Sequence, residues 1–194
     1  MATYLCLLLF FVINNTAIFY LTPVEVKWRI SLVVFLFSFI FPVLNIFILV
    51  KLKRIPSITL SERKDRTFPF LLVTLFYFGL FYLLMDLNIW NSIKLFIFGG
   101  ALSILACLVI NLKFKISIHM VGIGGFLGVL ISLAYLINVD LTPYYIATII
   151  VAGIIGFARL FLNEHKPLQI YLGFFLGVII QTGLFFGLQK ITFI

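Results

Sequence analysis

Residues 153–177 read GIIGFARLFLNEHKPLQIYLGFFLG. Two apolar runs flank a polar turn in which an arginine, a glutamate, a histidine and a lysine fall within eight residues, 159–166. Asn163 and Pro167 are typical of a helix end and a helix start. The stretch therefore predicts a hairpin of two apolar helices with a charged tip. Most polar residues at such a boundary only mark the water interface, so the cluster has to be weighed against that simpler explanation.

The whole chain is unusually apolar. Hydrophobic residues make up 64% of its 194 residues and charged residues 10%, and the mean hydropathy is +1.27. Soluble domains carry about 25% charged residues, so this composition excludes an ordinary soluble protein. The length holds about six or seven apolar helices of about 20 residues each. Because unpaired backbone cannot face lipid, we expect an all-α polytopic transmembrane bundle, a single integral membrane domain over residues 1–194.

Apolar runs predict seven spans, or six without the first, and segment 51–66 is the one long polar connector. The first run has no basic leader and no small-residue cleavage site, so we expect a retained span and not a signal peptide. Two Gly-x3-Gly pairs, at 173/177 and 183/187, predict close packing of the last span. The predicted spans are residues 3–22, 28–50, 68–87, 90–112, 116–138, 143–162 and 167–189.

Counting spans places three polar clusters on one side of the membrane. The connector 51–66, the segment 113–119 and the turn 159–166 are separated by two spans each, so they return to the same face. Ten of the 14 Lys and Arg residues fall there, which predicts a cytoplasmic face. If four of these ten cations bind a ligand, six remain to set the topology, against four on the opposite face. The ten are Lys51, Lys53, Arg54, Arg63, Lys64, Arg66, Lys113, Lys115, Arg159 and Lys166; the others are Lys27, Arg29, Lys94 and Lys190.

The net charge of +8 favours membrane lipids or phosphate ligands as partners over nucleic acid, because the cations lie between spans. Both histidines, His119 and His165, fall among the cations of the clustered face, where Ser117 is placed to cap a helix start. A single interfacial histidine is ordinary, but two beside several cations suit phosphate chemistry. One imidazole can attack phosphorus while the other protonates the leaving alcohol and guanidinium groups hold the oxygens. Carboxylates are scarce on this face, so zinc or magnesium hydrolysis fits worse and no metal or cofactor is expected.

The order of these motifs resembles that of the type-2 phosphatidic acid phosphatase superfamily. Residues 158–169, ARLFLNEHKPLQ, are similar to its third signature, S-R-x5-H-x3-D, with the Arg-to-His spacing intact. Residues 116–119, ISIH, resemble its second signature, P-S-G-H. Residues 61–69, SERKDRTFP, stand where the first, K-x6-R-P, is expected, but Thr59 occupies the lysine position. The resemblance covers about residues 61–177, which would form the catalytic bundle.

This resemblance implies a metal-independent phosphatase that acts on a lipid phosphate or isoprenyl phosphate in a bacterial inner membrane. His165 would form a phosphohistidine, and His119 would protonate the leaving group. Gln169 stands in place of the aspartate that orients the nucleophile; its carbonyl can still accept the Nδ1–H but brings no charge. Family members commonly act outside the cytoplasm, opposite to the charge count. The residues that would hold the phosphoryl oxygens are Arg159, Ser117, Arg63 and Arg66.

Two other interpretations stay open. Loss of the orienting carboxylate in a related triad costs about 10⁴ in rate, which favours a non-catalytic lipid-binding or assembly protein. A lipid transporter is the third possibility, but transporters place polar groups near mid-bilayer. The few polar residues at that depth here are Asn14, Asn15, Asn45 and Gln181.

Overall fold

The computed structural model describes residue 7 and residues 23–58, 60, 62–87 and 89–188. Throughout these ranges the regular elements are helices, and none is a strand, so the all-α prediction is confirmed for them. In chain order they are α3 (Val24–Phe35), the π-helical stretch η2 (Leu36–Ile40), α4 (Phe41–Lys51), α5 (Arg63–Met85), α6 (Asn91–Asn111), α7 (Ile118–Ile137), α8 (Thr142–Phe161) and α9 (Pro167–Gly187).

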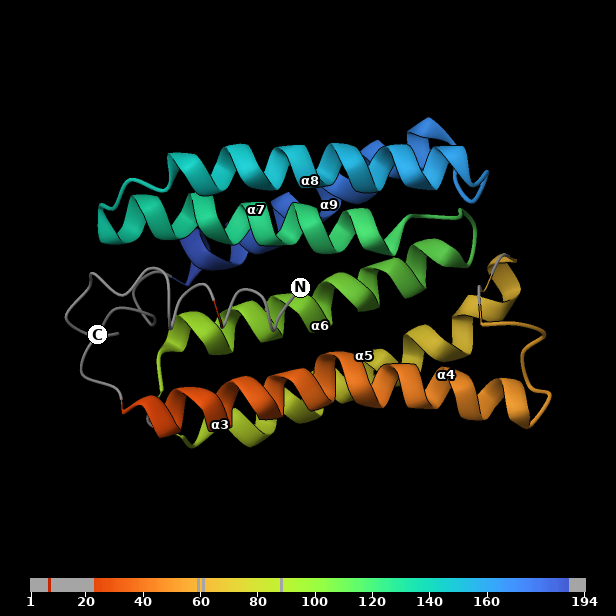
Figure 1. Cartoon of the computed structure of the whole chain (residues 1–194), viewed down its shortest axis with the longest axis horizontal. Coiled ribbons are helices and arrows are strands. Elements are labelled where there is room, and N and C mark those ends of the chain that lie inside the picture. Colours follow the sequence, from red (N-terminus) through yellow and green to blue (C-terminus); the bar gives the residue numbers. More distant parts are fainter. Residues whose placement is uncertain (1–6, 8–22, 59, 61, 88, 189–194) are drawn as a thin grey trace.

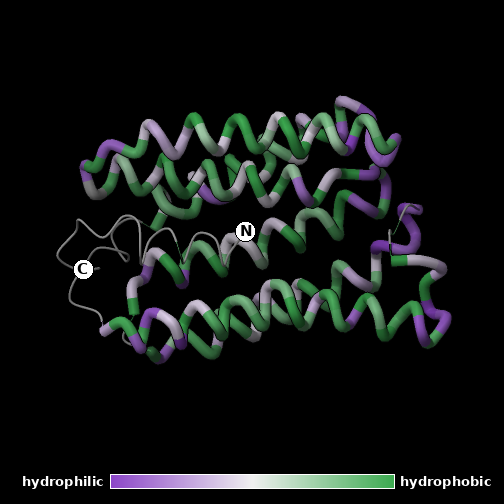
Figure 2. The backbone as a smooth tube through the Cα atoms, in the orientation of Figure 1, coloured by the Kyte–Doolittle hydropathy of each residue, from purple (hydrophilic) through white to green (hydrophobic). Residues whose placement is uncertain are grey.

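Six helical stretches are long and apolar enough to cross a membrane. The first runs through α3, η2 and α4 as one span, Val24–Lys51, and the other five are α5 to α9. They coincide with six of the seven predicted spans, as a multi-pass membrane protein requires; the predicted span 3–22 lies outside the described residues. Figure 2 shows the apolar residues along the helices and most of the hydrophilic ones towards their ends.

α6 lies between two groups of helices (Figure 1). α7, α8 and α9 pack together on one side of it, and α3, η2, α4 and α5 lie on the other. The described parts of three connectors, 52–62, 112–117 and 162–166, lie together at the right-hand end in Figure 1. We call this the connector end of the bundle. The predicted meeting of the three polar clusters on one side is therefore confirmed.

The first described span changes its winding just before a proline. Pro42 has no N–H to donate to the carbonyl four residues earlier, so regular α-helical bonding is interrupted at that position. The π-helical stretch Leu36–Ile40 lies just before Pro42. Short π-helical stretches are a common way for a helix to accommodate a local change in its hydrogen bonding. α4 then continues along α5 to the connector end.

α7 and α9 form a backbone-to-backbone contact through small residues. A Cβ added at Gly177 would overlap the carbonyl oxygen of Val121 and lie 2.6 Å from the nitrogen of Gly125. In lipid, where the hydrophobic effect does not drive helices together, such close packing is a main source of attraction. At Gly183 and Gly187 an added Cβ would meet no described atom within 4 Å. Only the first of the two predicted Gly-x3-Gly pairs therefore packs against a neighbouring helix in the part of the chain that the structure describes.

The same packing reaches the connector end. A Cβ at Gly173 would lie 2.8 Å from the carbonyl oxygen of Ser117. The Ser117 N–H in turn donates to the carbonyl oxygen of Gln169 at 3.3 Å. The start of α7 is thus held against the start of α9, which brings the segments around the two histidines together.

Replacing Gly177 with alanine should destabilise the bundle, whereas the same change at Gly183 should have little effect. The methyl group at 177 has to push the backbone of α7 away, and overpacking of this kind costs about 1–3 kcal/mol. Thermal midpoints of the two purified variants in detergent measure the difference. Equal midpoints for the two variants would contradict the α7–α9 contact described above.

Candidate functional site

A pocket of about 210 Å³ lies at the connector end. Its wall is built from α4, α5, the start of α7, the end of α8 and two of the three connectors, so distant parts of the chain contribute to one site. The polar residues of the wall are Arg66, His119, Arg159, Glu164 and His165. The apolar residues are Ile46, Ile58, Leu60, Pro69, Phe70, Val73 and Ile118.

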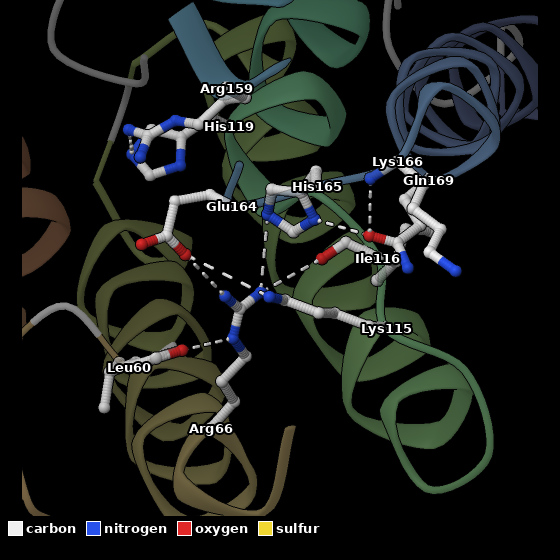
Figure 3. A network of polar contacts seen from close by, with 10 residues as sticks. All are labelled: Leu60, Arg66, Lys115, Ile116, His119, Arg159, Glu164, His165, Lys166 and Gln169. Atoms are coloured by element: carbon white, nitrogen blue, oxygen red, sulfur yellow. Dashed lines mark hydrogen bonds and ion pairs between the residues drawn. The ribbon is translucent and has the colours of Figure 1, made fainter. Parts of the chain in front are cut away.

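Arg66 is the centre of the polar network in Figure 3. Its side chain is 7% exposed, and its Nε donates to the carbonyl oxygen of Leu60 at 2.7 Å. Nη1 lies 3.5 Å from the carbonyl oxygen of Ile116 and 3.5 Å from Nε2 of His165. Nη2 lies 3.8 Å from a carboxylate oxygen of Glu164. A buried guanidinium needs several acceptors, and these come from all three connectors, so Arg66 ties the connectors together.

His165 is held at Nδ1 by Gln169, in the contact that the sequence predicts. Nδ1 lies 3.0 Å from Oε1 of Gln169, and the same oxygen accepts the backbone N–H of Lys166 at 3.1 Å. Because that N–H can only donate, Oε1 is the acceptor in both contacts, and Nδ1 of His165 carries the hydrogen. The guanidinium of Arg66 also can only donate, so Nε2 presents a lone pair to it. The ring is therefore the neutral Nδ1–H tautomer with its free nitrogen facing Arg66.

The surroundings of His165 keep the ring uncharged. Burial lowers the pKa of His165 to about 4, and the positive charges of Arg66, Lys115 and Arg159 act in the same direction. The hydrogen bond to Gln169 opposes them in part. His165 is consequently neutral at neutral pH, which is the state that a nucleophilic imidazole requires.

Histidine labelled with nitrogen-15 should report this state directly, because the chain has only two histidines. In His119→Ala protein, the remaining ring should stay a neutral Nδ1–H tautomer from about pH 8 to about pH 5, with protonation centred near the pKa of about 4. The pKa of His165 is lowered because the native state stabilises the neutral ring. The ring therefore binds a proton only at a pH below the usual 6.5. A titration centred near the usual value would contradict the buried position among cations.

His119 and Arg159 form a second pair in the same pocket (Figure 3). His119 lies in the first turn of α7 and Arg159 in the last turn of α8. Nη2 of Arg159 lies 3.0 Å from Nε2 of His119, which therefore accepts the hydrogen bond. His119 is exposed, whereas His165 is only 9% exposed. The two rings thus present Nε2 to two different arginines of one pocket.

Two further charged residues, Glu164 and Lys115, join the network without a role predicted from the sequence. The Glu164 carboxylate lies 4.0 Å from Nζ of Lys115 in addition to its contact with Arg66. Burial lowers the pKa of Lys115, the charge of Arg66 adds to this, and Glu164 opposes it. Lys115 lies four residues before His119, and Glu164 lies directly before His165. These positions are the only sequence signals that connect the two residues with the site.

Two of the predicted phosphate-binding residues, Ser117 and Arg63, are not among the residues that line the pocket. Ser117 is the N-cap residue of α7, as predicted, but its hydroxyl makes no capping bond and finds no hydrogen-bond partner among the described residues. The carbonyl oxygen of Arg63 accepts the side-chain N–H of Asn111 at 2.9 Å, which fastens the start of α5 to the end of α6. Through their backbone groups both residues hold the segments that carry the pocket.

The assembled groups suit an oxyanion with an electrophilic centre. Guanidinium groups bind phosphate oxygens through paired donors, and a neutral imidazole with a free Nε2 is a nucleophile. Within the described ranges, no three His, Cys, Asp or Glu side chains gather as a metal site would require. Comparison with protein-family models, with curated proteins and with solved structures finds no match, so the chemistry of the site is inferred from its own geometry.

Proposed function

We propose that this chain is a lipid-phosphate phosphatase that works without a metal ion and forms a phosphohistidine on His165. It would be a divergent member of the type-2 phosphatidic acid phosphatase superfamily and share its bundle. The supporting observation is the pocket at the connector end, where the Nε2 lone pair of His165 faces Arg66 and a second histidine–arginine pair lies nearby. Four side chains that sequence motifs single out therefore line one cavity.

In the first proposed step, Arg66 and Arg159 turn from the imidazoles to the phosphoryl oxygens. Nε2 of His165 then attacks phosphorus, so an N–P bond forms and the P–O bond to the alcohol breaks. Once Arg159 no longer donates to it, Nε2 of His119 takes up a proton from solvent, and His119 then gives this proton to the departing oxygen. Guanidinium groups in place before the reaction stabilise the charge that develops on the phosphoryl oxygens.

In the second step, water attacks the phosphorus of the phosphohistidine. His119 accepts a proton from this water, the N–P bond breaks, and neutral His165 and inorganic phosphate are restored. Throughout both steps Gln169 keeps the Nδ1–H in place, since its amide oxygen already accepts that hydrogen in the free protein. An amide dipole stabilises the charged phosphoimidazole less than a carboxylate does, so we expect a slow enzyme.

The apolar half of the pocket supports a lipid as the carrier of the phosphate. Ile46 of α4, Phe70 and Val73 of α5 and Ile118 of α7 line it next to the charged groups. A ligand that fills this space would carry hydrocarbon close to its phosphate. Such a ligand would reach the pocket from the bilayer, because α4 and α5 present many exposed apolar side chains along their length.

A second candidate function is the binding of a lipid phosphate without turnover. Two observations favour it: the residue that orients His165 is uncharged, and the resting Nε2 is held by Arg66. Binding to such a protein would use the same arginines but would leave the phosphate ester intact.

Phosphate release by purified protein separates these two functions. Wild-type protein in detergent, with a metal chelator present, should release inorganic phosphate from at least one member of a panel of lipid monophosphates and diphosphates. Binding without release would support the second function. Equal release by wild type and by a His119→Ala/His165→Ala double variant would contradict a role for the histidines.

A further inference from the structure

The pocket changes from charged to apolar along α5. Arg66, Phe70 and Val73 all line it, and their spacing along the sequence places them on one face of the helix. Arg66 lies near the start of α5, so Phe70 is about 6 Å and Val73 about 10 Å further into the span. Ile46 lines the same pocket from α4, short of the end of that helix at Lys51. We call Ile46, Phe70 and Val73 the inner wall of the pocket.

The inner wall offers no hydrogen-bond donor. Its three side chains are hydrocarbon, and its three residues lie inside helices, where the backbone N–H groups are used by the helix itself. Thr74, next to Val73, donates its hydroxyl to the carbonyl oxygen of Phe70 at 2.7 Å and does not line the pocket. Among the described residues that do line it, the side-chain donors are the arginines and histidines of the charged end, which the proposed mechanism uses for the phosphate.

Little water can stay between the inner wall and a bound chain. Phe70 is 5% exposed, and Ile46 and Val73 are half-buried. A chain that lies on these residues covers the apolar surface that remains. Water cannot replace the missing donors there, because a buried water molecule itself needs polar partners.

We propose that the pocket selects phosphates whose ester oxygen carries a plain hydrocarbon chain, such as an alkyl or isoprenyl phosphate, against the phosphates of glycerolipids. A glycerolipid phosphate has an oxygen on the carbon next to its phosphoester carbon. With the phosphate held by Arg66, this oxygen and the ester groups beyond it fall along the inner wall. They give up hydrogen bonds with water and find no donor in exchange, which is costly for a polar group. The inference rests on the proposed function, because it names the substrate class of the same site.

The test uses three single-chain monophosphates in neutral detergent micelles. One is dodecyl phosphate, the second is its analogue with an ether oxygen in place of the third methylene group, and the third is a lysophosphatidate of matched chain length. Dodecyl phosphate competes with each of the other two in one reaction, so that the ratio of the products gives the ratio of the kcat/KM values.

Three variants of the protein separate the missing donor from the size of the pocket. Val73→Asn adds an amide donor to the inner wall, and Val73→Ala enlarges the pocket without adding one. Val109→Asn places the same amide at an exposed position of α6 that does not line the pocket. Thermal midpoints in detergent show which variants are folded.

Wild type should prefer dodecyl phosphate about fivefold or more over the ether analogue and about 30-fold or more over the lysophosphatidate. Val73→Asn should bring the first ratio to within about twofold, whereas Val73→Ala and Val109→Asn should keep it. Equal kcat/KM values for the three substrates in wild type, or an unchanged preference in folded Val73→Asn protein, overturns the inference and leaves the proposed phosphatase standing. Absence of phosphate release from all three substrates overturns the proposed function and this inference together. The wild-type comparison needs no variant, so it tests the inference even if Val73→Asn does not fold.

Discussion

Phosphate release should fall by at least about 10⁴-fold when His165 is replaced with alanine. The reason is that no other described imidazole is placed to take over: His119 lies at the start of α7, and its Nε2 faces Arg159 and not Arg66. The pocket itself should survive, because Arg66 keeps its contacts with Leu60, Ile116 and Glu164. Initial rates with the best lipid phosphate of the panel, together with thermal midpoints, measure the effect.

His119→Ala is the matched control, because it removes the other histidine of the same pocket. Its rate should fall by about 10²–10³-fold with an alkyl phosphate, since general acid catalysis typically contributes that much. In kcat/KM with para-nitrophenyl phosphate, whose leaving group needs no proton, the loss should shrink to within about tenfold, because this constant does not include the later step in which His119 accepts a proton from water. His165→Ala should remain inactive with both substrates. Activity retained by His165→Ala, or an equal loss for both variants with both substrates, would contradict the roles proposed here.

The second largest effect is expected at Arg66. Arg66→Gln should lower kcat/KM by about 10²–10³-fold, as removal of a charged donor to a developing oxyanion typically does. Arg66→Lys should recover only part of the loss, because one ammonium group cannot contact Leu60, His165 and Glu164 at the same time. The thermal midpoint should also fall in Arg66→Gln, since the guanidinium joins all three connectors.

Arg63→Gln provides the comparison for Arg66. Arg63 lies one turn earlier on α5 and was an equal candidate for phosphate binding from the sequence, but it does not line the pocket. Its replacement should change kcat/KM by less than about threefold, because a charge partly screened by solvent acts weakly at a distance. Comparable losses in the Arg63 and Arg66 variants would mean that the phosphate binds elsewhere on the first turn of α5.

The fold is largely predictable because span length is set by the bilayer. Each apolar run of about 20 residues has only one way to satisfy its backbone in lipid, and six of the predicted runs reappear as helices. The π-helical stretch before Pro42 is less accessible to such reasoning, since a proline within a span permits several local adjustments. Which glycine pair packs was also not predictable: the 173/177 and 183/187 pairs have the same spacing, and only neighbours in space distinguish them.

The site was partly predictable for a related reason. Parity of the spans brings His119 and His165 to one face, and helical spacing brings Gln169 to Nδ1 of His165, four residues away. Arg63 and Arg66 were equal candidates from the sequence, and the burial of Arg66 in the pocket distinguishes the two. Ile46 joins the pocket through packing between helices that are distant in the sequence, for which a single sequence carries no signal.

The central claim is that His165 carries the phosphoryl group during turnover. It is tested most directly by mixing the wild-type protein with a lipid phosphate labelled at phosphorus, stopping the reaction in denaturant at alkaline pH and mapping the labelled peptide. The proposed mechanism predicts an acid-labile, alkali-stable label on residue 165 that forms before free phosphate appears and is missing from His165→Ala. Rapid phosphate release with no label on residue 165 at any time, or an equal label in His165→Ala, would contradict it.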